Sequence, residues 1–348
     1  MINRAHIAVV LATATTLAHA GAPRPVAFRT KTMGTWATLT IVTADSTAVA
    51  DLAYQSLLVL HRVDSLMSNW TQTSDVARIN RDAGKSSVAV HPEVATVLEL
   101  AQRVTHDSDG AMDITVEPLV RLWGFLGGTR RVPSQDEITQ ALRSVGPDQV
   151  HYDAVRRTIR FSSPTTRIDL GGIAKGYGVD CVAEKLRRDG ATHALVDLSG
   201  NMVAIGDAAG KDGWSVGIRD PSDQHPYIGT VRLRDDAIST SGNYEQFVDA
   251  DGKRYGHIID PRTGWPAQGL SSVTVVASTA MLCDAWDTGL FVLGSEKART
   301  VAKAHHEFAV VIVEPRSDGG FVVWVEESLR SRFKIEPGMQ GRITLRYF

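Results

Sequence analysis

Long runs of like charge are absent from this sequence, and so are long apolar runs after its first twenty residues. The 348 residues include 37 Lys and Arg against 39 Asp and Glu, a formal net charge of -2, and no run of Lys or Arg exceeds two residues. A nucleic-acid surface needs an excess of positive charge, so we expect no nucleic-acid partner. No later segment is apolar enough to span a membrane.

Cysteine is also scarce, because the chain contains only Cys181 and Cys283. An exported chain could pair the two. Both lie in segments with the pattern of amphipathic helices, where a buried free thiol is the alternative. The sequence does not give the geometry that a disulfide needs, so both possibilities stay open.

The first twenty residues have the pattern of a signal peptide. Arg4 supplies the positive start, residues 7–17 are apolar, and Ala18-His19-Ala20 fits the small-x-small cleavage pattern. An uncleaved anchor or a buried helix is the alternative. We expect 1–20 to be removed and 21–348 to be an exported, periplasmic protein, with no cysteine near the cut for lipid attachment.

The remaining chain alternates strand and helix patterns irregularly, without internal repeats or low-complexity linkers. Such mixed order predicts an α+β fold rather than a doubly wound parallel sheet, with a possible subdomain boundary near 127–134. Period-two and apolar patterns predict strands at 36–43, 194–198, 214–218, 228–233, 273–277, 308–314 and 320–325. Helical spacing predicts helices at 51–67, 92–105, 172–188 and 279–293 and a short helix after the capping box of Ser134 and Glu137.

A glycine-rich segment, Arg167-Ile-Asp-Leu-Gly-Gly-Ile-Ala-Lys-Gly-Tyr-Gly-Val-Asp180, is the first candidate for chemistry. We expect a strand that ends at Asp169, a tight turn at the glycines, and a helix whose free N–H groups suit a phosphate. Lys175 could add positive charge in the first turn. Tyr177 stands where a Walker loop needs Lys, and a plain strand-to-helix turn remains the alternative.

Thr279-Ala-Met-Leu-Cys-Asp-Ala-Trp-Asp-Thr-Gly-Leu290 is the second candidate. On a helix, Asp284, Asp287 and Thr288 share one face, being three and four residues apart. Carboxylates and a hydroxyl are hard oxygen ligands that suit Mg²⁺. The alternative is a solvated helix face.

Two further segments are less specific. Tyr255-Gly-His-Ile-Ile-Asp-Pro-Arg-Thr-Gly264 contains a turn signal after His257, which could be a base or a structural residue. Ala111-Met-Asp-Ile-Thr-Val-Glu-Pro-Leu-Val-Arg-Leu-Trp-Gly124 could form the floor of a ring-binding pocket around Asp113, or a core helix or strand.

Together these segments resemble the FAD:protein FMN transferase (ApbE) family. The resemblance begins at Thr32-Met-Gly-Thr35, includes Met67-Ser-Asn-Trp70, and extends to about Gly294. It implies an α+β protein with an FAD cleft between two parts of the chain. It also implies Mg²⁺-dependent transfer of FMN from FAD to a Thr or Ser of a partner, with release of AMP. The usual partner is a membrane-bound electron-transfer subunit.

The resemblance also implies roles for individual residues. Asp284, Thr288 and the backbone carbonyl of Gly172 would hold the metal, and Asp287 stands where some members carry a third acidic ligand. Trp70 replaces a more usual Tyr, which keeps the aromatic face and puts its hydrogen bond in doubt. His257 is the candidate base for the acceptor proton, with Asp284 as the alternative. The flavin contacts would be Met33, Trp70, Ala111, Met112, Asp113, Asp169, Lys175, His257 and Ile258.

Two other functions remain open on the sequence. With water as nucleophile the same site would make an FAD pyrophosphatase that releases FMN and AMP. A non-catalytic periplasmic flavin-binding protein is the third possibility, although mere binding does not require the oxygen ligands at Asp284, Asp287 and Thr288.

Overall fold

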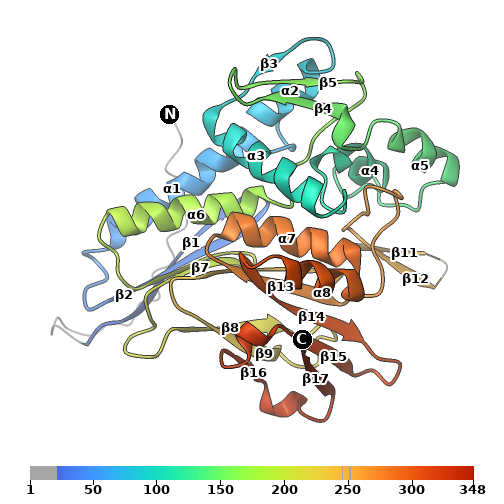
Figure 1. Cartoon of the computed structure of the whole chain (residues 1–348). Helices are drawn as coiled ribbons and strands as arrows, with labels where there is room; N and C mark the ends of the chain where they lie inside the picture. The colour runs from blue at the N-terminus through green and yellow to red at the C-terminus, as the bar shows by residue number, and fades with distance from the viewer. Residues whose placement is uncertain (1–21, 245, 251) are drawn as a thin grey trace.

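The computed structural model describes residues 22–244, 246–250 and 252–348 (Figure 1). The predicted signal peptide at 1–20 therefore lies outside the described residues. Among the helices of the described part, none has the length and apolar character needed to cross a bilayer.

A nine-stranded sheet forms the centre of the molecule (Figure 1). All neighbouring strands in it are antiparallel except the last pair, β15 and β17. The largely antiparallel sheet with helices confirms the predicted α+β class. Across the sheet the strands are β1 (Arg24–Thr32), β2 (Thr35–Thr43), β6 (Ala194–Leu198), β7 (Asn201–Ile205), β10 (Ala237–Gly242), β13 (Ser272–Ala277), β14 (Phe308–Pro315), β15 (Phe321–Val325) and β17 (Ile343–Tyr347).

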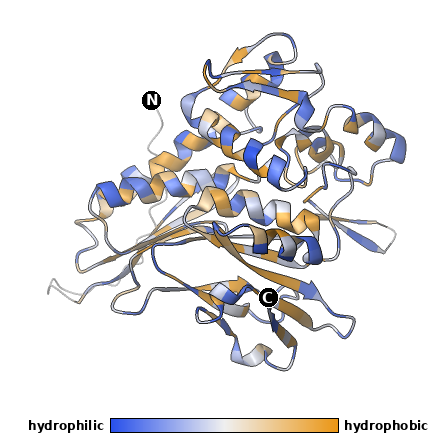
Figure 2. Ribbon diagram, in the orientation of Figure 1, coloured by the Kyte–Doolittle hydropathy of each residue, from blue (hydrophilic) through white to orange (hydrophobic). Residues whose placement is uncertain are grey.

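Both faces of the central strands are buried. In β14, Val310 and Ile312 belong to the core under the helices, whereas Val311 and Val313 belong to a second core on the opposite face. This alternation follows from the period-two geometry of a strand. It explains why the strand is an almost continuous apolar run, and Figure 2 shows the concentration of hydrophobic residues on these strands.

Helices cover one face of the sheet and a small sheet covers part of the other (Figure 1). The small sheet has the order β16-β9-β8 and packs through Trp214, Val231 and Phe333. Its strands are β8 (Trp214–Arg219), β9 (Tyr227–Leu233) and β16 (Phe333–Ile335). The covering helices are α1 (Ala50–Met67), α6 (Ala174–Arg188), α7 (Ala280–Leu293) and α8 (Ser295–Ala304).

The segment between α1 and α6 forms a further group of elements above the helical layer and shares its hydrophobic core (Figure 1). It includes a three-stranded sheet of order β3-β5-β4. Residues 127–134 lie between α4 and α5, whose Leu119 and Ile138 share one hydrophobic cluster. The elements are α2 (Asp75–Asp82), β3 (Val88–Ala89), α3 (Pro92–Asp107), α4 (Glu117–Leu122), α5 (Gln135–Leu142), β4 (Val150–Asp153) and β5 (Thr158–Phe161), with short 3₁₀ turns at Ile114–Val116 and Pro147–Gln149.

Most predicted elements are confirmed within two residues, and the capping box of Ser134 and Glu137 is present. One prediction is wrong, because no strand ends at Asp169: residues 166–170 are irregular and β5 ends at Phe161. Side-chain bonds from Asn80 hold the Ile168 backbone there in place of a sheet partner. The two thiols, Cys181 and Cys283, are free.

Candidate active site

The start of α7 is fixed by two capping side chains. Thr279 accepts a hydrogen bond from the backbone of Leu282, and Asp180 of α6 accepts bonds from Ala280 N (2.7 Å) and Met281 N (2.8 Å). These bonds satisfy N–H groups that the first turn of a helix leaves without a partner. Because Asp180 belongs to α6, the same bonds tie α7 to that helix.

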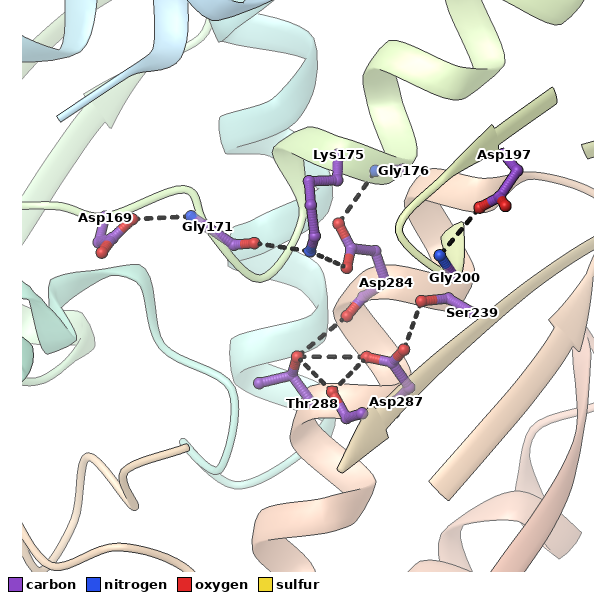
Figure 3. A network of polar contacts seen from close by, with 11 residues as sticks. Asp169, Gly171, Lys175, Gly176, Asp197, Gly200, Ser239, Asp284, Asp287 and Thr288 are labelled. Atoms are coloured by element: carbon purple, nitrogen blue, oxygen red, sulfur yellow. Dashed lines mark hydrogen bonds and ion pairs between the residues drawn. The ribbon is translucent and has the colours of Figure 1, made fainter. Parts of the chain in front are cut away.

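The two helices also cross very closely. A β-carbon on Gly176 would lie 2.2 Å from the carbonyl oxygen of Ala280. Only a residue without a side chain permits this approach. The crossing brings the first turn of α6 beside the first two turns of α7, and Figure 3 shows Lys175 pointing toward Asp284.

Asp284 is bound at both of its carboxylate oxygens. Lys175 Nζ lies 3.2 Å from Oδ1, and the backbone N–H of Gly176 donates to Oδ2 at 3.0 Å (Figure 3). Lys175 also donates to the carbonyl of Gly171 at 3.2 Å. The anion beside Lys175 is therefore a carboxylate of the protein itself. This carboxylate is buried, because Asp284 is only 3% exposed.

Asp287 faces the main sheet rather than α6. It accepts hydrogen bonds from the hydroxyls of Ser239 (2.5 Å) and Ser241 (2.9 Å), both on β10. Thr288 Oγ1 lies 3.2 Å from Asp287 Oδ1 and 3.2 Å from the carbonyl of Asp284. The predicted common face of Asp284, Asp287 and Thr288 is thus a buried cluster between α6, α7 and β10 (Figure 3).

The electrostatics of this cluster are unbalanced. Burial, with the neighbouring Asp284 carboxylate, raises the pKa of Asp287 well above its ordinary value, although Ser239 and Lys175 oppose the shift. Two buried carboxylates share one ammonium group, and buried charge is unfavourable unless it is neutralised. The site would therefore gain from an additional cation.

The glycine turn lies against this cluster. Gly171 N donates to Asp169 Oδ1 at 2.8 Å, and a β-carbon on Gly172 would lie 3.2 Å from Thr288 Oγ1. Helix α6 begins at Ala174, two residues later than predicted. Ile173 N–H and Ala174 N–H donate to the carbonyl of Leu170. With Gly171 N–H bound to Asp169 and Gly176 N–H to Asp284, four N–H groups of this turn and helix start are used within the protein.

The residues present fit a magnesium ion. Carboxylate, hydroxyl and backbone oxygens are the ligands that Mg²⁺ prefers, and Asp284, Asp287, Thr288 and Gly172 supply all three kinds at one place. No group of three or more His, Cys, Asp or Glu side chains suited to a metal occurs in the described part of the chain. An ion here would consequently need the Thr288 hydroxyl or a backbone oxygen as well as the two acids.

His257 follows β12 (Lys253–Gly256), and its ring lies next to an aromatic ring. Its ring centre is 6.3 Å from that of Phe125, nearly edge-on, and its backbone N–H donates to Gln246 O at 3.0 Å. Nδ1 is buried and makes no hydrogen bond within the described residues. Burial, with the positive charges of Lys175 and Arg130, lowers the pKa of His257 to about 4. The imidazole is therefore neutral near pH 7, and no carboxylate among the described residues forms an ion pair with it.

The residues predicted to contact the flavin differ in accessibility. Trp70 is 72% exposed, whereas Ile258 is only 8% exposed. Met33 is partly buried, has a positive φ of 48°, and donates its N–H to Asp64. Of the predicted set, Trp70 has by far the most surface to offer a planar ring.

Of the other predicted flavin contacts, Ala111, Met112 and Asp113 are buried, whereas Asp169, Lys175 and His257 are half-buried. Ala111 and Met112 are 1% and 4% exposed, and Met112 packs against α7 at Gly289. Asp113 caps the 3₁₀ turn that follows it through bonds to Thr115, and burial raises its pKa. Burial likewise raises the pKa of Asp169. The segment is a loop followed by the 3₁₀ turn and α4, rather than a continuous helix or strand.

Several residues of the site were not predicted from the sequence. Ser239 and Ser241 hold Asp287, and Asp180 caps α7 from one hundred residues away. The two serines are two residues apart in β10, and this spacing could have predicted that both side chains lie on one face of the strand. No local sequence pattern predicts that Asp180 caps α7.

A family model and several relatives match most of this chain. Residues 33–312 match the model of the ApbE family. The FAD:protein FMN transferase of Salmonella typhimurium is 34% identical over 308 residues, covering 86% of this chain and 87% of that protein. The Escherichia coli FAD:protein FMN transferase is 34% identical over 311 residues with the same coverage.

Solved structures match as well. The flavin transferase ApbE from Vibrio cholerae superposes with a TM-score of 0.80 at 32% identity, covering 89% of this chain and 99% of that one. The ApbE protein of Thermotoga maritima gives a TM-score of 0.79 at 32% identity with the same coverage.

Proposed function

This chain belongs to the ApbE family, and from that premise we propose that it is a Mg²⁺-dependent FAD:protein FMN transferase. It moves the FMN half of FAD to a Thr or Ser hydroxyl of another protein and releases AMP. The observation that supports the proposal most directly is the buried cluster of Asp284, Asp287 and Thr288 against the Gly172 turn.

The transfer exchanges a phosphoanhydride bond within FAD for a phosphoester bond to the acceptor. The acceptor hydroxyl oxygen attacks the phosphorus of the FMN half, and the bond from that phosphorus to the bridging oxygen breaks. AMP leaves with the bridging oxygen and its electron pair. His257 is our candidate for the base that takes the hydroxyl proton, since its neutral ring can accept one, although the lowered pKa makes it a weaker base than an exposed imidazole. Asp284 is the alternative, but Lys175 and Gly176 N–H occupy its oxygens.

Asp284, Asp287, Thr288 and the Gly172 carbonyl would hold Mg²⁺, which supplies charge neutralisation for pyrophosphate oxygens. Lys175 adds fixed positive charge at the same place. The exposed face of Trp70 suits a flavin ring, and Met33, Ala111, Met112, Asp113, Asp169, His257 and Ile258 complete the proposed FAD contacts.

We place the protein in the periplasm, exported by the signal peptide at residues 1–20. Its acceptor then has to present a Thr or Ser in the same compartment. A membrane-bound electron-transfer subunit is the acceptor that fits this placement.

Co-expression of the full chain with candidate acceptors, followed by a gel scan for covalent flavin fluorescence, tests the proposal. Purified protein with FAD and Mg²⁺ separates the alternatives. A fluorescent acceptor band with AMP release is the expected result. Free FMN without a band would instead identify a pyrophosphatase, and FAD left intact would identify a binding protein.

A further inference from the structure

A small hairpin leads directly into His257. It consists of β11 (Phe247–Ala250) and β12, and within the described part of the chain these strands pair only with each other. Figure 1 shows the hairpin projecting from the body of the molecule beside α4 and α5. The bond from His257 N to Gln246 O closes its base.

The faces of this hairpin are already engaged. Val248 and Tyr255 form a cross-strand pair on one face, where the Tyr255 ring lies 5.5 Å from that of Trp123. On the other face Arg254 forms an ion pair with Asp249 at 3.1 Å and covers the Phe247 ring at 3.8 Å. These contacts hold the hairpin in place, and the side-chain charges of Asp249 and Arg254 cancel.

The outer edge of β11 is what remains open. In an antiparallel pair, bonded and non-bonded residue pairs alternate. Because Gln246 and His257 are bonded, the pair of Phe247 and Gly256 and the pair of Asp249 and Arg254 are non-bonded, so their N–H and C=O groups point outward.

A side-chain contact on the opposite edge agrees with this assignment. Gln268 Nε2 donates to the outward carbonyl of Arg254 at 3.5 Å, which partly covers the edge of β12. The outward backbone groups of Phe247 and Asp249 form no hydrogen bond with another described residue.

We infer that the acceptor protein binds here, as an extended segment that adds a third strand to the outer edge of β11. An unpaired edge recognises an extended peptide through its main chain. An added strand lies about 4.8 Å from β11 and runs along it toward Gln246, whose carbonyl is bonded to His257. The acceptor hydroxyl is thereby led toward the candidate base. The inference rests on the proposed function.

The test uses Asp249→Pro in the full chain. Proline removes the outward N–H while leaving the inward bonds of the hairpin intact, and Asp249→Ala, which keeps that N–H, is the matched control. The acceptor is the protein that becomes fluorescent in the co-expression assay. We expect the acceptor KM to rise at least about fivefold in Asp249→Pro, the loss of one hydrogen bond, with FAD affinity unchanged and Asp249→Ala near wild type.

Equal acceptor KM values for Asp249→Pro and Asp249→Ala, whether raised or not, would overturn strand addition. If Asp249→Pro fails to fold, prolines placed one by one in the acceptor beside its flavinylated residue decide the matter. Sensitivity at alternate positions is expected, and uniform or absent sensitivity contradicts the inference. A wild-type enzyme that labels no acceptor would refute the proposed function instead.

Discussion

Asp284 and Asp287 lie in one buried cluster, yet their surroundings differ. Asp284 is bound by Lys175 and by the N-terminal backbone of α6, whereas Asp287 is held by two serine hydroxyls of β10. Asp284 therefore lies beside both the glycine turn and the positive charge that are proposed to face FAD. The two acids are expected to contribute differently to function.

For Asp284→Ala we expect loss of Mg²⁺-dependent FMN transfer with the fold retained. The change removes one of two buried like charges, which relieves repulsion on Asp287, but it also leaves Lys175 without that carboxylate. Titration calorimetry with Mg²⁺ and the fluorescent-band assay measure the effect. Transfer at the wild-type rate would exclude Asp284 from the metal site.

The next prediction concerns His257, which is a candidate base and not a candidate metal ligand. His257→Asn should slow transfer by about a hundredfold or more, the usual contribution of a positioned base, while FAD affinity changes little. Single-turnover rates and FAD titrations on the same preparation give both quantities. Weakened FAD binding with an unchanged maximal rate would make His257 a binding residue.

The protonation of His257 gives a pH dependence whose sign is fixed. Its pKa falls from 6.5 to about 4 on folding, so the unfolded chain binds the proton more tightly. The stability due to the neutral ring is present above pH 6.5 and is lost as pH falls toward 4. We expect the His257 ring to titrate near pH 4 by NMR and to stay neutral from pH 6 to 8. A ring that titrates near 6.5 would contradict this burial.

At the scale of elements, the crossing of α6 and α7 places the site, and Gly176 permits it. Alanine favours a helix over glycine by about 1 kcal/mol, but its β-carbon would meet backbone at 2.2 Å. We expect Gly176→Ala to lose at least about 2 kcal/mol of unfolding free energy. In the matched control, Gly178→Ala, the nearest atom is the end of the Leu60 side chain at 3.0 Å, which can move. Urea unfolding of both variants should separate them, and equal stabilities would show that the helices shift apart freely.

Helices and apolar strands could be predicted from the sequence because their signal is local. The apolar spacing of α1 and the continuous apolar run of β14 each carry their own pattern. Strand β1 was missed because its buried positions include Thr30 and Thr32, which look polar. The irregular segment before Gly171 was mistaken for a strand because Asn80, far away in the sequence, supplies its hydrogen bonds.

The same distinction between local patterns and distant contacts applies to the candidate site. The common face of Asp284, Asp287 and Thr288 follows from helical spacing and was predicted. The ion pair of Lys175 with Asp284 depends on how α6 and α7 cross, and the serine bonds to Asp287 depend on the neighbouring strand. No local sequence pattern predicts either of these contacts.

At the scale of the whole molecule, the acidic cluster joins two layers. Its residues come from α6 and α7 in the helical layer and from β10 in the main sheet. A cation bound there would neutralise repulsion between buried carboxylates and connect the layers at once. A ligand that binds only the folded state stabilises that state by about 2.7 kcal/mol when the free ligand concentration is a hundred times Kd.

We therefore expect Mg²⁺ to raise the melting temperature of the full chain, even without FAD. Asp287→Asn should reduce the rise, because it removes one charge from the cluster while keeping an acceptor for Ser239 or Ser241. Its apo form should be at least as stable as wild type, since burial raises the pKa of Asp287 and so makes its ionised form unfavourable. Calorimetric scans with MgCl₂, against NaCl at equal ionic strength, measure both effects. The same rise in melting temperature in both salts, or in both wild type and Asp287→Asn, would mean that no cation binds between the two layers.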